Sequence, residues 1–229
     1  MQLFQCHESP RAGSGEARIE TPEGALVTTA MVGSATLAGP QEAVRLVRGG
    51  RLFAWDHGDC RLELLRCPVS PAWLAGTLEG SEALEGCEAA VWRFLARADA
   101  ACVSLRCVWE TLPLAARGGP DSGQFLAAQT WQIGGRRVSL GTEDEASLAL
   151  RAAEGIGLPT RLAPLLGPHA VAYEPLGLRV SLPKLRAGEC GQLRFLVAWS
   201  TPRRADDAAT WFAVGVLSIP RLLAQAGCQ

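Results

Sequence analysis

The sequence predicts a mainly β protein, built as an antiparallel β-sandwich or one strongly curved sheet with two or three peripheral helices. Three observations favour this fold class. Two Gly-Gly pairs stand between alternating segments, which is typical of β-hairpin turns. Other segments alternate apolar and polar residues with the period of two that a half-buried strand requires. No regular succession of strand, helix and strand, the pattern of a parallel sheet, runs along the chain.

The two predicted hairpins are the best-defined elements. Val44–Arg48 and Arg51–Trp55 flank Gly49-Gly50, and glycine tolerates the positive φ that a two-residue hairpin turn demands. Around the second pair, Gly134-Gly135, we expect strands with one buried and one solvated face. These flanking strands are 130–133 and 136–140.

Seven further segments are predicted to be strands from their composition and alternation, and they are 18–21, 25–31, 60–65, 101–112, 178–182, 193–199 and 211–217. The last of them, Trp211–Leu217, is apolar at odd and even positions alike. A strand with two apolar faces belongs inside a sheet, so we expect a central strand there.

Three helices are predicted from their ends and their apolar faces. Thr142–Glu145 matches a capping box, and Gly155 can close the helix that follows. Between 86 and 100, Val91, Phe94, Leu95 and Ala98 fall on one helical face. The third helix has proline early, after Ser218, and glycine late, at position 227.

Composition sets the class of protein. With 229 residues, 48% of them hydrophobic and 20% charged, the chain can bury one core, and we expect a single domain over 1–229. The stretch 113–123, rich in glycine and proline, is the one segment that resembles an internal junction. The N-terminus has no signal-peptide pattern and no apolar run approaches about 20 residues, so we expect a cytoplasmic protein without a membrane partner.

Charge and missing motifs exclude several function classes. The net charge of −1, from 22 basic and 23 acidic residues, gives no reason to expect nucleic acid as a partner. Lys184 is the only lysine, which leaves one position for Schiff-base chemistry and almost none for a phosphate-binding loop. Gly-x-Ser-x-Gly, His-Glu-x-x-His and Cys-x-x-Cys motifs do not occur.

One turn combines several metal-ligating groups. Imidazole, carboxylate and thiolate all bind zinc or iron, and a turn held by two strands can orient them. The interpretation without a metal is that the Asp and Gly residues simply make a turn. The candidate ligands are Asp56, His57, Asp59 and Cys60, with Cys6 and His7 as additions from the N-terminus.

The cysteines allow a second kind of chemistry. Eight cysteines without an export signal are expected to be reduced and mostly to pack in the core. Cys60 and Cys67 are seven apart, so on one strand they face opposite sides. A catalytic thiol would pair Cys60, Cys6 or Cys190 with an activating imidazole. That imidazole would belong to His57 or His169. For Cys190 the competing interpretation is a residue that merely occupies a turn.

Two functions of different class follow from these observations. The first is a cytosolic, non-catalytic binding or assembly module that contacts another protein or itself through apolar β-sheet surface. The reason is compositional: with a mean hydropathy of +0.12 and 20% charged residues, few charges are available to cover the sheet surface and its edges. Of seven tryptophans, Trp73 is expected to be an exposed binding anchor. The alternative is a metal-dependent or thiol enzyme centred on residues 56–60.

Overall fold

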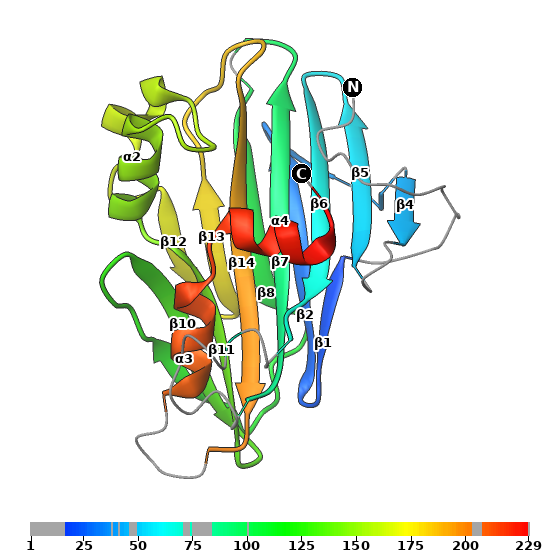
Figure 1. Ribbon diagram of the computed structural model, residues 1–229, viewed down its shortest axis with the longest axis vertical. Coiled ribbons are helices and arrows are strands. Elements are labelled where there is room, and N and C mark those ends of the chain that lie inside the picture. Colours follow the sequence, from blue (N-terminus) through cyan, green and yellow to red (C-terminus); the bar gives the residue numbers. More distant parts are fainter. Residues whose placement is uncertain are drawn as a thin grey trace.

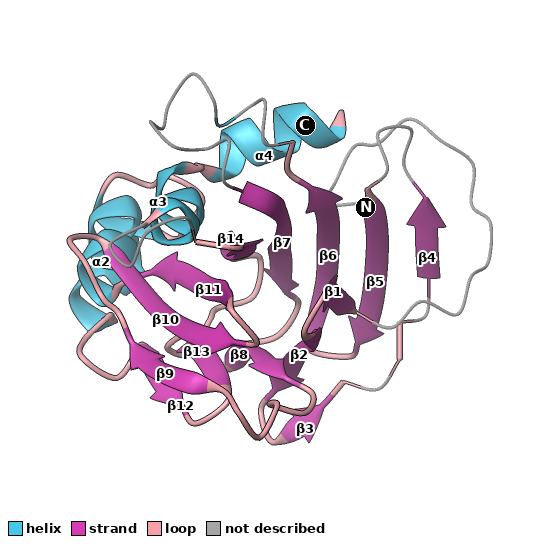
Figure 2. Ribbon diagram, turned by 90° about the horizontal axis from the view of Figure 1, so that it is seen from below, coloured by secondary structure: helices cyan, strands magenta, loops and turns pink. Residues whose placement is uncertain are grey.

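Two antiparallel sheets pack face to face and a helical layer covers part of the larger one (Figures 1 and 2). This arrangement confirms the predicted mainly β, sandwich-like fold with few helices. The computed structural model describes residues 17–37, 39–40, 42–45 (backbone only), 50–70, 74, 84–99, 101–202 and 208–228.

The spatial order of the strands differs from their order in the sequence. The six-stranded sheet consists of β1 (Arg18–Thr21), β2 (Gly24–Val32), β8 (Val103–Trp109), β13 (Gly177–Ser181) and β12 (Val171–Glu174), with β3 (Ala35–Thr36) paired to β2. The eight-stranded sheet consists of β4 (Glu42–Arg45), β5 (Arg51–His57), β6 (Cys60–Pro68), β7 (Leu84–Ala96), β14 (Cys190–Ser200), β11 (Arg136–Glu143), β10 (Leu126–Ile133) and β9 (Arg117–Pro120). The helices are α2 (Glu145–Ala153), the 3-10 helix η2 (Thr160–Leu165), α3 (Ala209–Val216) and α4 (Ile219–Ala226).

The central strands of the eight-stranded sheet are buried on both faces. Its inner face forms the main core with the other sheet, and its outer face forms a second core with α3 and α4. On β7, Ala90 and Trp92 belong to the first core, whereas Ala89 and Val91 belong to the second. Such a strand carries an unbroken apolar run instead of simple alternation.

This double burial corrects the prediction of a helix over 86–100. The segment is strand β7, which pairs with β6 on one side and β14 on the other. Apolar residues of this strand face both cores, so they occupy odd and even positions alike. This distribution produces the apparent helical periodicity. Periodicity alone does not separate a fully buried strand from a buried helix.

The opposite correction applies to Trp211–Leu217, for which the sequence predicts a central strand. Residues 209–216 form helix α3, with Thr210, Ala213 and Val214 buried against the outer face of the sheet. Gly141 of β11 permits this approach, because a Cβ at that position would lie 2.6 Å from Val214 Cγ2.

The structure confirms the predicted turn of one hairpin and not that of the other. Ile133 lies opposite Arg136, and Gly134 and Gly135 have φ of 56° and 88°, so the second hairpin is confirmed with its two-residue turn. The strands of the first hairpin also pair, but Arg45 lies opposite Arg51. Five residues therefore connect them, which makes the predicted two-residue Gly49-Gly50 turn wrong. Residues 46–49 lie outside the described part.

The helix ends are governed by local chemistry. The predicted capping box at Thr142 is wrong: Asp144 caps α2 by accepting from Ser147 N–H, and Thr142 stays in β11. Gly155, at φ 69°, follows the helix as expected. Helix α4 begins after Ser218 and ends at Gly227, also as predicted.

The stretch 113–123 contains strand β9 and carries the chain from one sheet to the other. Within the described residues, no single helix is long and apolar enough to cross a membrane. Helices α3 and α4 meet that criterion only as a pair, and they are bent by 89° at their junction.

Candidate functional site

Strand alternation separates the predicted ligands of the 56–60 turn. β5 and β6 pair to their ends, with His57 opposite Cys60 and Asp56 opposite Arg61. Residues directly opposite each other share a face, and successive residues alternate faces. Cys60 lies in the core between the sheets, so His57 shares the inner face while Asp56 lies on the outer face. Asp59 is exposed in the turn itself.

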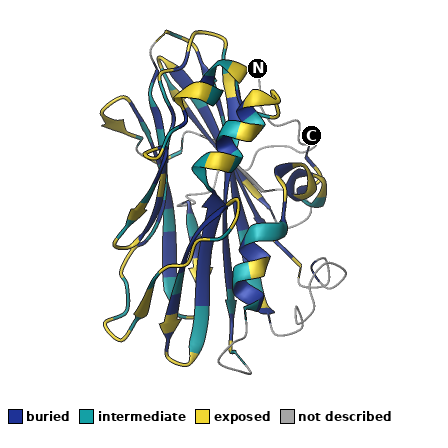
Figure 3. Cartoon of the chain, turned by 90° about the vertical axis from the view of Figure 1, so that its left-hand side faces the viewer, coloured by how far each residue is buried: buried dark blue, intermediate teal, exposed yellow. Residues whose placement is uncertain are grey.

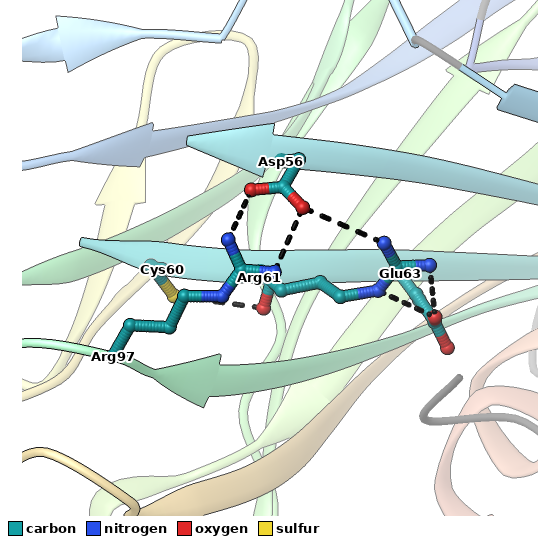
Figure 4. A network of polar contacts seen from close by, with 5 residues as sticks. All are labelled: Asp56, Cys60, Arg61, Glu63 and Arg97. Carbon is teal, nitrogen blue, oxygen red and sulfur yellow. Dashed lines mark hydrogen bonds and ion pairs between the residues drawn. The ribbon is translucent and has the colours of Figure 1, made fainter. Parts of the chain in front are cut away.

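The Asp56 carboxylate is held by arginines (Figure 4). Arg97 binds both of its oxygens, with Nη2 at 2.7 Å from Oδ2, and Arg61 Nη1 lies 3.7 Å from the same oxygen. The hydrogen bond from Arg97 is the largest cause that lowers the pKa of Asp56. Arg61 also donates from Nε and Nη2 to Glu63 Oε1, at 3.1 and 3.0 Å. The Asp56 carboxylate is therefore engaged in ion pairs with arginines.

No group of three or more His, Cys, Asp or Glu that could hold a metal ion occurs among the described residues. Asp56, His57, Asp59 and Cys60 do not converge, because they are divided between two faces and the turn. Cys6 and His7, the two additional candidates, lie outside the described residues, as does the predicted anchor Trp73.

The thiols of the core are poorly suited to nucleophilic chemistry. Burial raises the pKa of Cys60 to about 11 and that of Cys67 to about 12, so both stay protonated at neutral pH. As predicted, these two face opposite sides, since they belong to different cores. Cys190 is exposed as the first residue of β14, and His169 is exposed in the loop before β12.

Among the seven cysteines that the structure describes, the expectation of reduced thiols holds except at Cys228. Six cysteines are free: Cys60, Cys67, Cys87, Cys102, Cys107 and Cys190. Cys228, which directly follows the glycine cap of α4, is disulfide-bonded, so the prediction is wrong at this position.

A different group of side chains, which the sequence did not single out, stands around the turn between β9 and β10. We call it the aromatic rim, and it consists of Phe125, Tyr173, Trp211 and Phe212. The Trp211 ring lies over Gly123, where a Cβ would come 2.3 Å from Trp211 Cζ2. Its indole N–H donates to Asp121 O at 2.7 Å. The Phe212 ring stands edge-on to that of Trp211, with centroids 5.1 Å apart.

Tyr173 joins the same turn from the other sheet. It lies on β12, and its phenol lies near the side chain of Ser122 in the turn. Burial first, and then the nearby carboxylates of Glu145 and Asp144, raise the pKa of Tyr173. The turn therefore has α3 on one side, β12 on the other and the start of α2 close by.

Phe125 has a strained backbone. It is the one non-glycine residue with positive φ in the described part of the chain, at 64°. Gly123 and Leu126 exchange backbone hydrogen bonds of 3.0 and 3.2 Å, so Phe125 is the second central residue of a tight turn. An L-residue in this conformation costs about 1–2 kcal/mol. Strain of this kind recurs at functional sites, where surrounding structure maintains it.

Exposure distinguishes three of the four rim residues, all but Trp211, from the other aromatic residues. Phe125, Tyr173 and Phe212 are exposed by 50%, 39% and 46%, and they are the exposed aromatic side chains among the described residues. Figure 3 shows this side of the molecule, where the helices carry exposed residues as well as buried ones. Sequence patterns could not reveal the rim, because its members come from three separate segments.

The outward face of the six-stranded sheet carries two neighbouring polar pairs. Ser104 and Ser181 hydrogen-bond each other at 3.0 Å, and they lie opposite each other on β8 and β13. Arg106 and Arg179, the next pair on this face, both reach the carboxylate of Glu174. Val27 and Val108, which are opposite each other on β2 and β8, lie on the same face and are partly exposed.

No protein-family model matches the sequence, and no curated protein matches it. Any function must therefore be inferred from the residues and their geometry.

Proposed function

We propose that the chain is a non-catalytic binding or assembly module that contacts a protein partner through the aromatic rim. One observation carries the proposal: the exposed aromatic side chains of the described residues gather around a single strained turn. Aromatic residues supply large contact area with few rotatable bonds and are enriched among the residues that dominate binding energy.

The rim is the proposed contact surface because the inner sheet faces are buried and the outer faces are partly covered or carry ion pairs. The inner faces cover each other, and α3 and α4 cover part of the outer face of the eight-stranded sheet. The remaining face, on the six-stranded sheet, carries serine and arginine–glutamate pairs. Desolvating such pairs opposes binding unless the partner replaces their contacts.

The 56–60 turn gives no support to the alternative of a metal-dependent or thiol enzyme. Asp56 is ion-paired, and the Cys60 thiol is buried with a raised pKa. For this reason the binding function is the one we propose.

Position-specific photo-crosslinking tests the proposal. A benzophenone amino acid replaces Phe212 in one protein and Leu114 in another, and each is irradiated in lysate of the source cells. Leu114 is fully exposed and precedes β9 at the end opposite the turn, so it is a matched control. We expect a discrete protein adduct from position 212 and none from position 114. Adducts of equal yield from both positions, or none from either, would overturn the proposal.

A further inference from the structure

We infer that the aromatic rim accepts a basic segment of a partner protein, one that presents arginine or lysine beside an apolar residue. This inference rests on the proposed binding function and adds the chemistry of the partner. Its basis is that exposed aromatic side chains lie together with carboxylates, and that the segments forming the rim contain no lysine or arginine.

The segments that build the rim contain charged residues of one sign only. The segments that build it are 121–126, 144–147, 171–173 and 209–216, and they contain Asp121, Asp144 and Glu145 but no lysine or arginine. Asp121 is exposed, and its backbone carbonyl is bonded to Trp211. Asp144 and Glu145 lie close enough to Tyr173 to act on its hydroxyl. These segments therefore contribute only negative charge to the surface, and Arg194, which donates to Val214 O and Gly215 O of α3, is buried.

Several carboxylates elsewhere in the described residues are paired with arginines. Glu174 is paired with Arg106 and Arg179, Glu143 with Arg151, and Asp56 with Arg97. At the rim, Asp144 is engaged through a backbone N–H as the cap of α2, which does not neutralise its charge. An acidic surface attracts a basic partner and disfavours an acidic one.

The aromatic rings strengthen the same preference. A guanidinium or ammonium group over the face of Trp, Tyr or Phe is attracted by the ring quadrupole. The Trp211 and Phe212 rings pack edge-to-face, so the edge of one ring points at the face of the other. Apolar side chains of the partner would pack on the remaining exposed ring area. The expected occupant is therefore a segment that alternates cationic and apolar side chains.

Fluorescence anisotropy with defined peptides tests this inference. The probes are a labelled peptide of alternating arginine and leucine and its counterpart with glutamate in place of arginine. We expect saturable binding of the arginine peptide to the full chain and none of the glutamate peptide. Binding should weaken when NaCl is raised from about 50 mM to about 500 mM, because the attraction is electrostatic and screened by salt.

Variants locate the binding on the rim. Asp121→Asn combined with Glu145→Gln removes two charges and leaves the Asp144 cap in place, and we expect the Kd to rise about five- to tenfold. Phe125→Gly removes the ring while relieving the backbone strain, and we expect an increase of about three- to fivefold. Leu114→Ser, at the far end of β9, should leave the Kd unchanged.

Several outcomes would overturn the inference. These are equal binding of both peptides, equal binding by wild type and the rim variants, or a dimer in light scattering that Phe212→Ser abolishes, which would make a second copy the occupant. If position 212 still crosslinks a protein while the arginine peptide does not bind, the binding function stands and the basic partner is wrong. If both experiments fail, both proposals are wrong.

Discussion

At the scale of single residues, environment separates side chains of the same type. Cys60 and Cys190 both begin strands of the eight-stranded sheet, yet one is fully buried and the other exposed. Burial raises the pKa of Cys60 to about 11, so its reactive thiolate is scarce at neutral pH. Strand position is therefore a poor guide to the chemistry of a cysteine, and exposure is a better one.

Thiol alkylation tests this difference. In brief reaction with iodoacetamide at pH 8, we expect Cys190 to be modified before the other described cysteines, because it is exposed. Peptide mapping by mass spectrometry measures the rates. Cys190→Ser should remove the fast phase, whereas Cys60→Ser should keep it. Modification of Cys60 as fast as Cys190 in the folded protein would contradict the burial of Cys60.

Phe125 gives a second residue-level prediction. Both Phe125→Ala and Phe125→Gly remove the ring, but only glycine adopts the φ of 64° without steric cost. We expect the glycine variant to have the larger free energy of unfolding, by about 1 kcal/mol. Urea denaturation of the two variants measures it. An alanine variant that is more stable than the glycine variant would show that the turn is not strained.

At the scale of elements, close approach between α3 and β11 depends on a missing side chain. Gly141 lies beneath Val214, and Leu126 is the next neighbour on the sheet. A helix can pack this closely on a sheet only where a small residue makes room. The outer core is consequently sensitive to added volume at this position.

A double-mutant cycle measures that fit. Gly141→Ala places a Cβ 2.6 Å from Val214 Cγ2, and overpacking of this kind costs about 1–3 kcal/mol of stability. Val214→Ala alone leaves a cavity and is also destabilising. Because each change relieves the other, the double variant should be more stable than the sum of the single effects predicts. Strict additivity in chemical denaturation would contradict the contact.

At the scale of the whole molecule, the two sheets are joined at one end by Arg136. From the β10–β11 hairpin it donates to Glu23 of the β1–β2 turn at 2.8 Å and to Glu85 of β7 at 2.9 Å. Glu85 also accepts a hydrogen bond from Thr201. The hydrogen bonds from Thr201 and then Arg136 lower the pKa of Glu85 below its ordinary value of 4.5.

This lowering has a defined consequence for stability. A carboxyl with a lowered folded-state pKa stabilises the protein fully above its ordinary pKa and loses this contribution as pH falls through the lowered value. Arg136→Gln should therefore have a lower melting temperature than wild type at pH 6. The difference in melting temperature should shrink as the pH falls below about 4. Thermal scans across this range measure the effect. A difference that grows toward acid pH would contradict the assignment.

The order of strands also predicts how the molecule responds to cleavage. Segments before and after 113–123 interleave, because β7 pairs with β14 and β8 pairs with β13. We expect limited proteolysis within this stretch to leave the two fragments associated. They should co-elute in gel filtration until denaturant is added. Release of two independently folded halves in native buffer would contradict this prediction.

The sequence by itself determined those elements that local chemistry specifies. Gly134 and Gly135 supply the positive φ of a two-residue turn, and Ser218 and Gly227 bound α4 by the ordinary rules of helix ends. Alternation placed β1 and β13 because each has one buried and one polar face. It also separated Cys60 from Cys67 correctly.

Only the tertiary structure decided what depends on burial from two sides or on distant segments. Residues 84–96 form a strand and 209–216 a helix because the first lies between two cores and the second covers one of them. Both are apolar at most positions, so their periodicity did not distinguish them. The aromatic rim likewise exists because the fold brings Phe125, Tyr173 and Trp211 to one turn, although β12 and α3 lie far away in sequence. Local patterns carry no information about such neighbours.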